Sequence, residues 1–382
     1  MKLPKYIVVG SGLFGSVVAE RIASLVRERV LVIDRRSHVG GNSYSEVDDV
    51  TGIEYHKYGS HIFHTNMQHV VEYISNFIKL NSYQHKVFSE HQNKIYTMPI
   101  NLKTINDFYG CNLTPLEAES FMRQESRNEK VDGKNLEERA VSQIGRKLYD
   151  AFIKNYTFKQ WNIHPKDLPA SIINRLPVRY NYNNNYFNDT WQGIPMGGYG
   201  KMFEKMLTHP YIEISLETSL KDIISDITPR HCVIYTGMLD ELLDFQYGVL
   251  GWRSLRFEWE THPVLDYQGT SVINYPDVTK PYTRIHEFKH YHPERKEVFD
   301  SQETIICKEY PADYTIDSEA YYPVMTDSDI SLYQKYLKLA KERYPHWVFG
   351  GRLASYRYWD MDKTIENALL VFDTQVYKKG VL

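Results

Sequence analysis

"YIVVGSGLFGS", residues 6–16, decides the fold of this 382-residue chain, because an apolar strand runs straight into glycines spaced as G-x-G-x-x-G. Glycine at Gly10, Gly12 and Gly15 allows a tight turn and a close approach of the backbone to a pyrophosphate, ahead of a helix-compatible stretch. A second apolar strand, 30–33, then leads to Asp34, a carboxylate that can accept hydrogen bonds from a ribose. This order predicts a βαβ dinucleotide-binding unit; chance glycines in an ordinary turn are the alternative.

The residues after Asp34 distinguish between NAD and FAD, which both use such a unit. In "DRRSHVGGNSY", residues 34–44, a basic pair and an apolar residue precede Gly40, Gly41 and Asn42. This stretch resembles the second fingerprint of FAD-binding proteins related to amine oxidases, whose glycines let the loop pass close to the cofactor. We therefore expect non-covalent FAD; a plain Gly-Gly turn is the alternative.

Composition favours an enzyme that binds neither nucleic acid nor membranes. The formal net charge is −3, so no strong basic excess favours nucleic acid or an anionic membrane. The apolar runs are of strand length, and "MKLPK" passes directly into the first strand, so we expect neither a membrane span nor a signal peptide. Three widely separated cysteines, Cys111, Cys232 and Cys307, suggest a reducing cytoplasm and no metal cluster.

The dinucleotide-binding pattern fades after about residue 80 and returns in pieces, as in a domain interrupted by insertions. Thr114 to Glu117 form a capping-box helix start, and apolar residues then recur at four-residue spacing from Leu136 to Phe152. Stretches rich in β-formers follow one another between 246 and 312, which predicts an antiparallel sheet. Near the end of the chain, Asp360 and Asp362 stand where a last helix should begin; simple N-capping explains them, and such a helix could also aim its positive end at a reduced flavin.

We therefore predict an α/β fold with a discontinuous FAD-binding Rossmann-like domain. The expected division is residues 1–80, 195–245 and 320–382 for the FAD-binding domain, 105–160 for a helical domain followed by a mobile substrate loop, and 81–104, 161–194 and 246–319 for an antiparallel-sheet substrate domain.

Several motifs resemble one family over nearly the whole chain and in the same order. They include "HKYGSHIFHTN" (56–66), "YTFKQW" (156–161), "RLPVRYNYNNNYF" (175–187), "PYTRIHEFKH" (281–290) and "FGGRLASYRYWDMD" (349–362). Together they are similar to bacterial UDP-galactopyranose mutases. The resemblance implies a flavin-dependent isomerase of a nucleotide sugar, used for cell-surface polysaccharide biosynthesis, and a homodimer.

The family's chemistry explains why no protein nucleophile is evident. The chain has no G-x-S-x-G elbow and no cysteine-based motif that could hold the anomeric carbon. In the family, N5 of the reduced flavin attacks that carbon and displaces UDP; the adduct allows the ring to open and reclose without net redox change. The resemblance thus implies FAD that is active when reduced.

The same resemblance assigns the residues of the cofactor site. FAD would contact Gly10, Gly12, Phe14, Gly15, Asp34, Arg35, Gly41, Asn42, His61, Ile62, Arg352, Trp359, Asp360, Met361 and Thr364.

Catalytic and substrate residues follow in the same way. His61 and His64 would lie beside the flavin ring, although with His56 their spacing also allows a structural role or a metal site; we expect no metal. Arg175 and Arg284 would bind the diphosphate, since guanidinium groups pair bidentately with phosphate. The nucleotide sugar would be bound by His85, Phe152, Tyr156, Thr157, Trp161, Asn174, Arg175, Tyr186, Asn274, Arg284, Glu309, Tyr322 and Tyr358.

Four positions depart from the family pattern: Asn155 and Asn162 replace glycines, Asn174 replaces a basic residue, and His85 replaces an asparagine. The departures leave the flavin chemistry intact and put the sugar in question. UDP-galactose is the expected substrate, with UDP-GalNAc or dTDP-fucose as alternatives. An FAD oxidase or dehydrogenase of the amine-oxidase type, and a nucleotide-sugar-binding protein without catalysis, are the alternatives from other classes.

Overall fold

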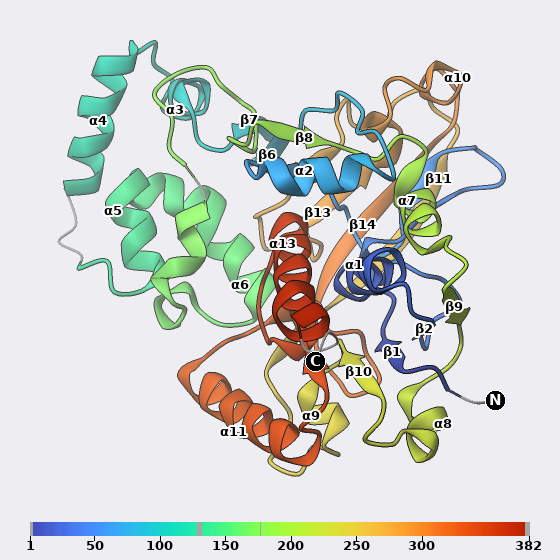
Figure 1. Ribbon diagram of the computed structural model, residues 1–382. Helices are drawn as coiled ribbons and strands as arrows, with labels where there is room; N and C mark the ends of the chain where they lie inside the picture. Colours follow the sequence, from blue (N-terminus) through green and yellow to red (C-terminus); the bar gives the residue numbers. More distant parts are fainter. Residues whose placement is uncertain (1–2, 128–131, 176, 379–382) are drawn as a thin grey trace.

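The computed structural model describes residues 3–127, 132–175 and 177–378 (Figure 1). Its first sheet is parallel and has the order β16-β10-β1-β2-β9. The strands are β1 (Tyr6–Val9), β2 (Val30–Ile33), β9 (Ile212–Ser215), β10 (Cys232–Tyr235) and β16 (Val348–Phe349). Residues far apart in the sequence thus share one sheet, which confirms the Rossmann-like unit and its interruption by insertions.

The turn between β1 and α1 (Leu13–Arg21) depends on glycine. Gly10 has a φ of +100°, a conformation that L-residues with side chains rarely adopt. A Cβ added at Gly15 would lie 2.0 Å from the carbonyl oxygen of Gly10, so the first turn of α1 packs directly on the end of the strand. Helix α1 then packs against α13 (Met361–Val371) and α7 (Gly198–Leu207), which covers one face of the sheet.

A second, seven-stranded sheet has the order β15-β11-β14-β13-β12-β6-β7. Its strands are β6 (Val87–His91), β7 (Lys94–Met98), β11 (Trp252–His262), β12 (Val272–Asn274), β13 (Arg284–Glu287), β14 (Thr304–Asp313) and β15 (Tyr322–Pro323). All neighbouring pairs are antiparallel except β12 and β6, which are parallel. The sheet is therefore mixed, because β6 joins its edge from an earlier part of the chain.

A helical lobe projects from the sheets (Figure 1). It contains α3 (Leu102–Tyr109), α4 (Pro115–Arg127), α5 (Leu136–Leu148) and α6 (Asn155–Trp161), with η3 (Tyr149–Lys154) joining α5 to α6. The residues with four-residue spacing, Leu136, Ala140, Ile144, Leu148 and Phe152, are all buried, so this prediction is confirmed. Gly145 interrupts the regular geometry of α5 with a φ of +72°, and an added Cβ there would come within 3.1 Å of Glu125 on α4.

The remaining elements connect these layers. They are η1 (Ile22–Val26), η2 (Gly41–Ser43), β3 (Ser45–Val47), β4 (Glu54–His56), β5 (Phe63–Thr65), α2 (Gln68–Ser75), η4 (Pro165–Asp167), η5 (Ala170–Arg175), β8 (Trp191–Gly193), α8 (Leu220–Ile223), η6 (Ile224–Asp226), α9 (Leu239–Leu242), η7 (Phe288–Tyr291), α10 (Lys296–Phe299), α11 (Asp327–Arg343), α12 (Gly351–Ala354) and η8 (Phe372–Tyr377).

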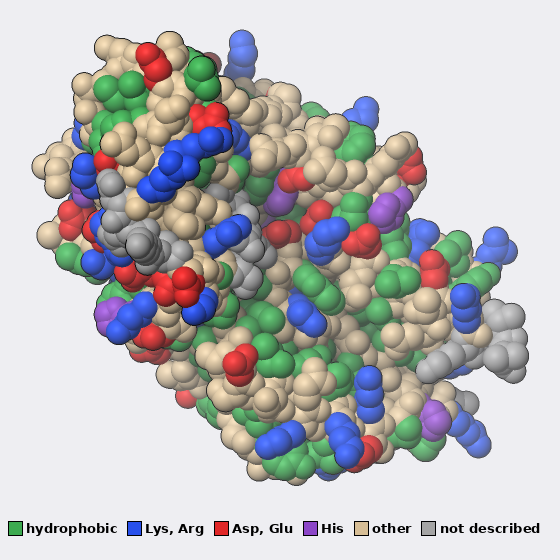
Figure 2. Space-filling model, turned by 90° about the vertical axis from the view of Figure 1, so that its left-hand side faces the viewer, with side chains coloured by type: hydrophobic (Ala, Val, Ile, Leu, Met, Phe, Trp, Pro, Cys, Tyr) green, Lys and Arg blue, Asp and Glu red, His purple; other side chains and the backbone are tan. Residues whose placement is uncertain are grey.

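On the face that carries the helical lobe, Lys and Arg side chains are interspersed with Asp and Glu, so that this face has no single sign of charge (Figure 2). In the described part of the chain, no helix combines the length and the apolar character needed to cross a membrane.

Gly15→Ala tests the steric constraint at the first turn of α1. The added methyl group would overlap the carbonyl oxygen of Gly10, so we expect loss of soluble, cooperatively unfolding protein. Gly110→Ala is the control. Gly110 has a left-handed φ of +66°, which Gly15 lacks, but no atom lies within 4 Å of an added Cβ, so this variant should lose only about 1–2 kcal/mol in a urea titration. A fully stable Gly15→Ala protein would contradict the predicted clash.

Candidate functional site

One continuous cavity of about 740 Å³ joins the two sheets. At one end it is lined by Val9, Ile33 and Tyr235, the last residues of three parallel strands. At the other end it reaches Asn274 and Arg284 on the second sheet. Ligands of open parallel sheets bind at the carboxyl ends of the strands, which makes this cavity the candidate active site.

The dinucleotide end of the cavity is a narrow backbone cradle. Gly12 and Gly41 face each other, and a Cβ added at Gly41 would lie 2.9 Å from the Cα of Gly12. All fifteen residues that the sequence assigns to the cofactor line the cavity. A backbone floor without side chains, at the N-terminus of α1, fits the pyrophosphate of a dinucleotide.

Asp34 supports this cradle from within the protein. Its Oδ2 accepts hydrogen bonds from the backbone N–H (2.8 Å) and the hydroxyl (2.6 Å) of Ser11, and its Oδ1 accepts one from the N–H of Arg36 (3.0 Å). The carboxylate predicted to bind a ribose therefore also fixes the glycine-rich turn. Glu319 pairs with both Arg35 and Arg36 at the same end, a pairing that the sequence did not indicate.

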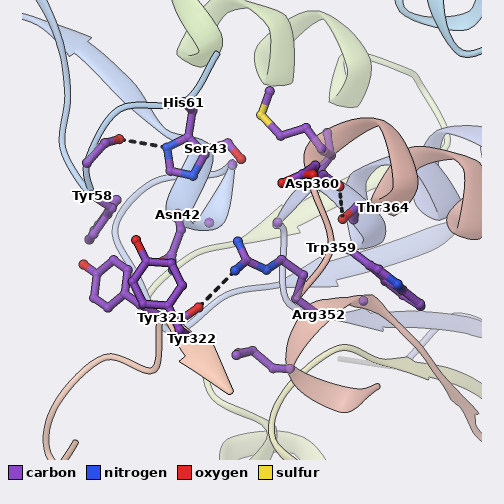
Figure 3. Close-up of a pocket in the computed structure, with 18 of the residues that line it drawn as sticks. Asn42, Ser43, Tyr58, His61, Tyr321, Tyr322, Arg352, Trp359, Asp360 and Thr364 are labelled. Carbon is purple, nitrogen blue, oxygen red and sulfur yellow. Dashed lines mark hydrogen bonds between the residues drawn. The ribbon is translucent and has the colours of Figure 1, made fainter. Parts of the chain in front are cut away.

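The C-terminal segment closes the opposite wall of the cavity (Figure 3). Helix α13 begins where the aspartates predicted it: Asp360 is its N-cap residue, and the Asp360 carbonyl oxygen accepts a hydrogen bond from the Thr364 hydroxyl. Asp362 accepts a hydrogen bond from Thr65 on β5. Arg352 donates to the Tyr321 carbonyl oxygen and lies over the ring of Tyr358, so the segment is fixed to β5 and to the residue that precedes β15.

The ring nitrogens of the predicted histidines have separate partners. Nδ1 of His61 donates to the Gly59 carbonyl oxygen (2.8 Å), and Nδ1 of His56 accepts from the backbone N–H of His61. His64 instead pairs with Asp189. Among the described residues, the group close enough to hold a metal ion is Asp266, Glu287 and His290, away from these histidines. Burial lowers the pKa of His61 to about 4, so its Nε2 remains an acceptor at neutral pH.

A buried ionic cluster underlies the sugar end of the cavity. Arg284 on β13 donates from Nε and Nη2 to Oε1 of Glu309 on β14, and His286 Nε2 lies 3.2 Å from the other carboxylate oxygen. Burial would raise the pKa of Glu309, but the Arg284 charge and the His286 hydrogen bond outweigh this effect and lower that pKa to about 2. Glu309 therefore stays ionised and fixes the guanidinium of Arg284, which lines the cavity. Among the described residues, no hydrogen-bond partner is found for Nη1 of Arg284.

Lys159 fixes the loop that precedes Arg284. Its ammonium group contacts the carbonyl oxygens of Tyr275, Asp277, Lys280 and Tyr282. Burial lowers its pKa to about 8. The basic residue of the "KQW" motif thus joins α6 to the loop between β12 and β13, and this contact was not predicted from the sequence.

The structure brings together only part of the predicted substrate site. The residues that line the cavity are His85, Tyr156, Tyr186, Asn274, Arg284, Glu309, Tyr322 and Tyr358, together with the predicted catalytic His61 and His64. Phe152, Thr157 and Trp161 do not line it. Phe152 is buried against Tyr96 and Phe108 in the helical lobe. Asn174 and Arg175 lie in η5, and their side chains are outside the part of the chain that the structure describes.

Of the departures from the family pattern that the structure describes, only His85 lines the cavity. Asn162 ends α6 in the left-handed conformation, with a φ of 52°, and its side chain donates to Asp313. Asparagine tolerates this backbone geometry better than most residues, and the added hydrogen bond fixes the helix end to β14. Asn155 begins α6 and does not line the cavity. Asn162 therefore has a structural role.

Several cavity residues were not predicted: Tyr58, Phe187, Asn188, Asp189, His286 and Tyr321. Phe187 to Asp189 directly follow Tyr186, and this adjacency was the available signal.

Comparisons with known proteins agree with this geometry. A family model described as UDP-galactopyranose mutase matches residues 151–358, and one described as an NAD(P)-binding Rossmann-like domain matches residues 8–77. A probable UDP-galactopyranose mutase of Klebsiella pneumoniae is 40% identical over 96% of this chain and 93% of its own. A dTDP-fucopyranose mutase of Escherichia coli is 37% identical, covering 96% of both chains.

Solved structures share the fold. A crystal structure of reduced UDP-galactopyranose mutase matches with a TM-score of 0.73 at 15% identity, covering 99% of this chain and 96% of its own. A putative protoporphyrinogen oxidase from Exiguobacterium sp. 255-15 matches with a TM-score of 0.62 at 11% identity, covering 97% and 98%.

His85 makes a pH-dependent contribution to stability that can be measured. Burial lowers its pKa to about 3, so between that pH and about 6.5 the unfolded chain binds a proton that the folded protein does not. Stability should therefore fall as the pH falls below about 6.5. Replacing His85 with Gln should reduce this slope by up to about 1.4 kcal/mol per pH unit in urea titrations. His69→Gln, on the exposed surface of α2, is the control, and identical slopes for His85→Gln and wild type would contradict the prediction.

Proposed function

The chain belongs to the UDP-galactopyranose mutase family of isomerases, and from this premise we propose that it interconverts UDP-galactopyranose and UDP-galactofuranose with bound FAD. The observation that carries the proposal is the single cavity, which connects a dinucleotide cradle to a fixed guanidinium and a cluster of imidazole and phenol groups. An oxidase of the amine-oxidase type is not favoured, because the relatives are named mutases.

FAD fits the dinucleotide end. Gly12 and Gly41 leave a floor of backbone that side chains would fill, and the N-terminus of α1 faces it. The start of α13 and Arg352 line the cavity farther along. Bound in its reduced form, FAD would supply a nucleophile for the anomeric carbon without net redox change.

Arg284 binds the diphosphate of the substrate in this proposal. Its Nε and Nη2 are held by Glu309, so the guanidinium is oriented before substrate arrives. A fixed positive charge stabilises the UDP leaving group as the bond to the sugar breaks. The side chain of Arg175 is the proposed second diphosphate ligand, on the resemblance of "RLPVR" alone.

The imidazoles and phenols bind the sugar. His61 presents an acceptor at Nε2, and Tyr156, Tyr186, Tyr322 and Tyr358 surround the sugar end. When the ring opens, these groups keep the free hydroxyl and carbonyl oriented and exclude water. Phe152 and Trp161 would need to act through neighbours, since neither lines the cavity; Trp161 lies 6.5 Å from Tyr322, centroid to centroid.

A second candidate substrate is dTDP-fucopyranose. The relative with that printed activity is nearly as similar to this chain as the probable UDP-galactopyranose mutase. His85 replaces the usual asparagine inside the cavity, and a buried polar group of this kind discriminates between sugars by the hydroxyls that it can pair.

The wider setting belongs to the same proposal: a homodimer in the cytoplasm that supplies furanose for a cell-surface polysaccharide. The three cysteines are free thiols, as expected in a reducing compartment. The division into FAD-binding, helical and sheet domains is likewise proposed, with β15 pairing with the large sheet.

Gly12→Ala tests the FAD cradle separately from the fold. An added Cβ would meet no protein atom closer than 3.9 Å, at an ordinary φ of −64°, so the apoprotein should fold normally. The methyl group would occupy the space of the pyrophosphate, and we expect FAD to bind at least tenfold more weakly, measured by flavin absorbance and equilibrium dialysis. Gly269→Ala, on a loop between β11 and β12, should keep FAD; unchanged affinity in Gly12→Ala would contradict the proposed position.

Activity should appear only after reduction, for example by dithionite, and no reductant should be consumed per turnover. We expect kcat/KM for UDP-galactofuranose to exceed that for dTDP-fucofuranose and for the furanose of UDP-GalNAc.

Arg284→Ala should lower turnover at least tenfold with FAD still bound, since a charge-assisted contact contributes about 1.5–3 kcal/mol. Arg256→Ala, exposed on β11, is the control. Stoichiometric peroxide formation would instead indicate an oxidase.

A further inference from the structure

Asp189 forms a hydrogen bond with His64 that the sequence did not predict. Nδ1 of His64 lies 2.7 Å from Oδ2 of Asp189. The pairing of β5 with β8 places His64 opposite Gln192, so the loop that carries Asp189 lies beside the histidine. Both side chains line the cavity, and Asp189 therefore supports His64 at the edge of the proposed substrate site.

The other oxygen of Asp189 continues a directed chain of hydrogen bonds. Oδ1 of Asp189 accepts from Nδ2 of Asn66. Oδ1 of Asn66 accepts from the backbone N–H (2.9 Å) and the hydroxyl (3.0 Å) of Thr190. Because a backbone N–H can only donate, the amide of Asn66 has one allowed orientation, with its NH₂ group toward Asp189.

This chain fixes the position of a proton on His64. A carboxylate only accepts hydrogen bonds, so Nδ1 of His64 must carry a hydrogen. The ring is held in plane by Phe187, stacked at 3.6 Å between centroids and 13° between planes. No hydrogen bond joins Nε2 to any residue in the described part of the chain, which leaves this nitrogen for a ligand in the cavity.

We propose that Asp189 is a positioning residue: it holds the proton of His64 on Nδ1, so that Nε2 is the atom that accepts a hydrogen bond from a sugar hydroxyl of the substrate. The identity of that substrate rests on the proposed function. The position of the ring proton of His64 rests on the hydrogen-bond chain alone.

His85 provides the contrast. It also stacks on Phe187, with 5.5 Å between ring centroids. Its Nδ1 faces the Tyr83 hydroxyl, which also meets the hydroxyl of Ser271. Hydroxyl groups can donate or accept, so this support allows either tautomer. Of the two imidazoles that stack on Phe187, His64 is therefore the one whose acceptor nitrogen is fixed.

Asp189→Asn should reverse the hydrogen bond between residue 189 and His64. Asn66 still presents its NH₂ group, so the new amide must turn its oxygen toward Asn66 and its own NH₂ group toward His64. Nδ1 of His64 then becomes the acceptor, and the proton moves to Nε2. In the FAD-loaded, ¹⁵N-histidine-labelled protein, we expect the protonated and unprotonated ring-nitrogen signals of His64 to exchange between Nδ1 and Nε2. His64→Gln identifies these signals among the 15 histidines.

A double exchange restores the original direction. In Asn66→Asp with Asp189→Asn, the new carboxylate at 66 accepts from both Thr190 and the amide at 189. The amide oxygen at 189 then faces His64, and Nδ1 regains its proton. The double variant has the same net charge as wild type, but its negative charge lies at residue 66, one hydrogen bond farther along the chain from His64. It therefore separates the effect of the tautomer from the effect of a charge beside His64.

We expect Asp189→Asn to lower kcat at least tenfold with KM changed less than threefold, and the double exchange to recover kcat to within threefold of wild type. Flavin content and melting temperature of each variant verify folding. The proposal is overturned if His64 keeps its proton on Nδ1 in Asp189→Asn, or if the double exchange restores the tautomer without restoring kcat. If wild type isomerises no nucleotide sugar, the proposed function fails, while the NMR comparison still decides the tautomer.

Discussion

The buried carboxylate of Glu309 is the constraint on which the sugar end of the cavity depends. A charge that is 1% exposed would be strongly destabilising without partners, and Arg284 and His286 provide them from the neighbouring strand. Nδ1 of His286 in turn forms a hydrogen bond with the Ser60 hydroxyl (2.6 Å). Ser60 follows Gly59 in the turn between β4, which ends at His56, and β5, which contains His64. Correct registry of β13 and β14 therefore fixes the guanidinium of Arg284. Through Ser60 it also connects the seven-stranded sheet to the turn between β4 and β5.

The sequence predicted the dinucleotide end well because the rule there is local and steric. Gly15 is required by contacts with Val8 and Gly10, a few residues away, and the φ of +100° at Gly10 is a property of the turn itself, so the spacing carries this information. The close approach of Gly10 to Thr236 lies beyond what the spacing indicates. Arg284 and the histidines were found through motifs, which preserve identity but say nothing of partners. The pairing of His64 with Asp189 spans 125 residues, and that of Arg284 with Glu309 spans 25 across two strands. Such contacts exist only once strand registry is set.

Phe152 and Asn162 lie away from the cavity, although the motifs predict that they lie near the nucleotide. Phe152 follows the helical spacing that buries Leu136 and Leu148, and the lobe packs it against Tyr96 and Phe108 instead of the cavity. An aromatic residue on an apolar helix face belongs to the core by default, and the periodicity already indicated this. Asn162 looked like a change near the nucleotide because it adjoins Trp161. Its left-handed φ shows that it replaces glycine for conformational reasons.

The cavity contains both uncharged imidazoles and a charged guanidinium, and these groups differ in what they can bind. Burial lowers the pKa of His61 to about 4 and that of His85 to about 3, and it also lowers the pKa of His286. At neutral pH these imidazoles are uncharged. His286 pairs with Ser60 and Glu309, and in the proposed function His61 and His85 exchange hydrogen bonds with sugar hydroxyls without attracting the diphosphate. Arg284 stays charged beside an ionised Glu309. In the proposed function, the fixed guanidinium of Arg284 binds the diphosphate and the neutral rings bind the sugar, which gives the nucleotide sugar one binding direction. Arg352, which also lines the cavity, is held instead against Tyr321 and Tyr358.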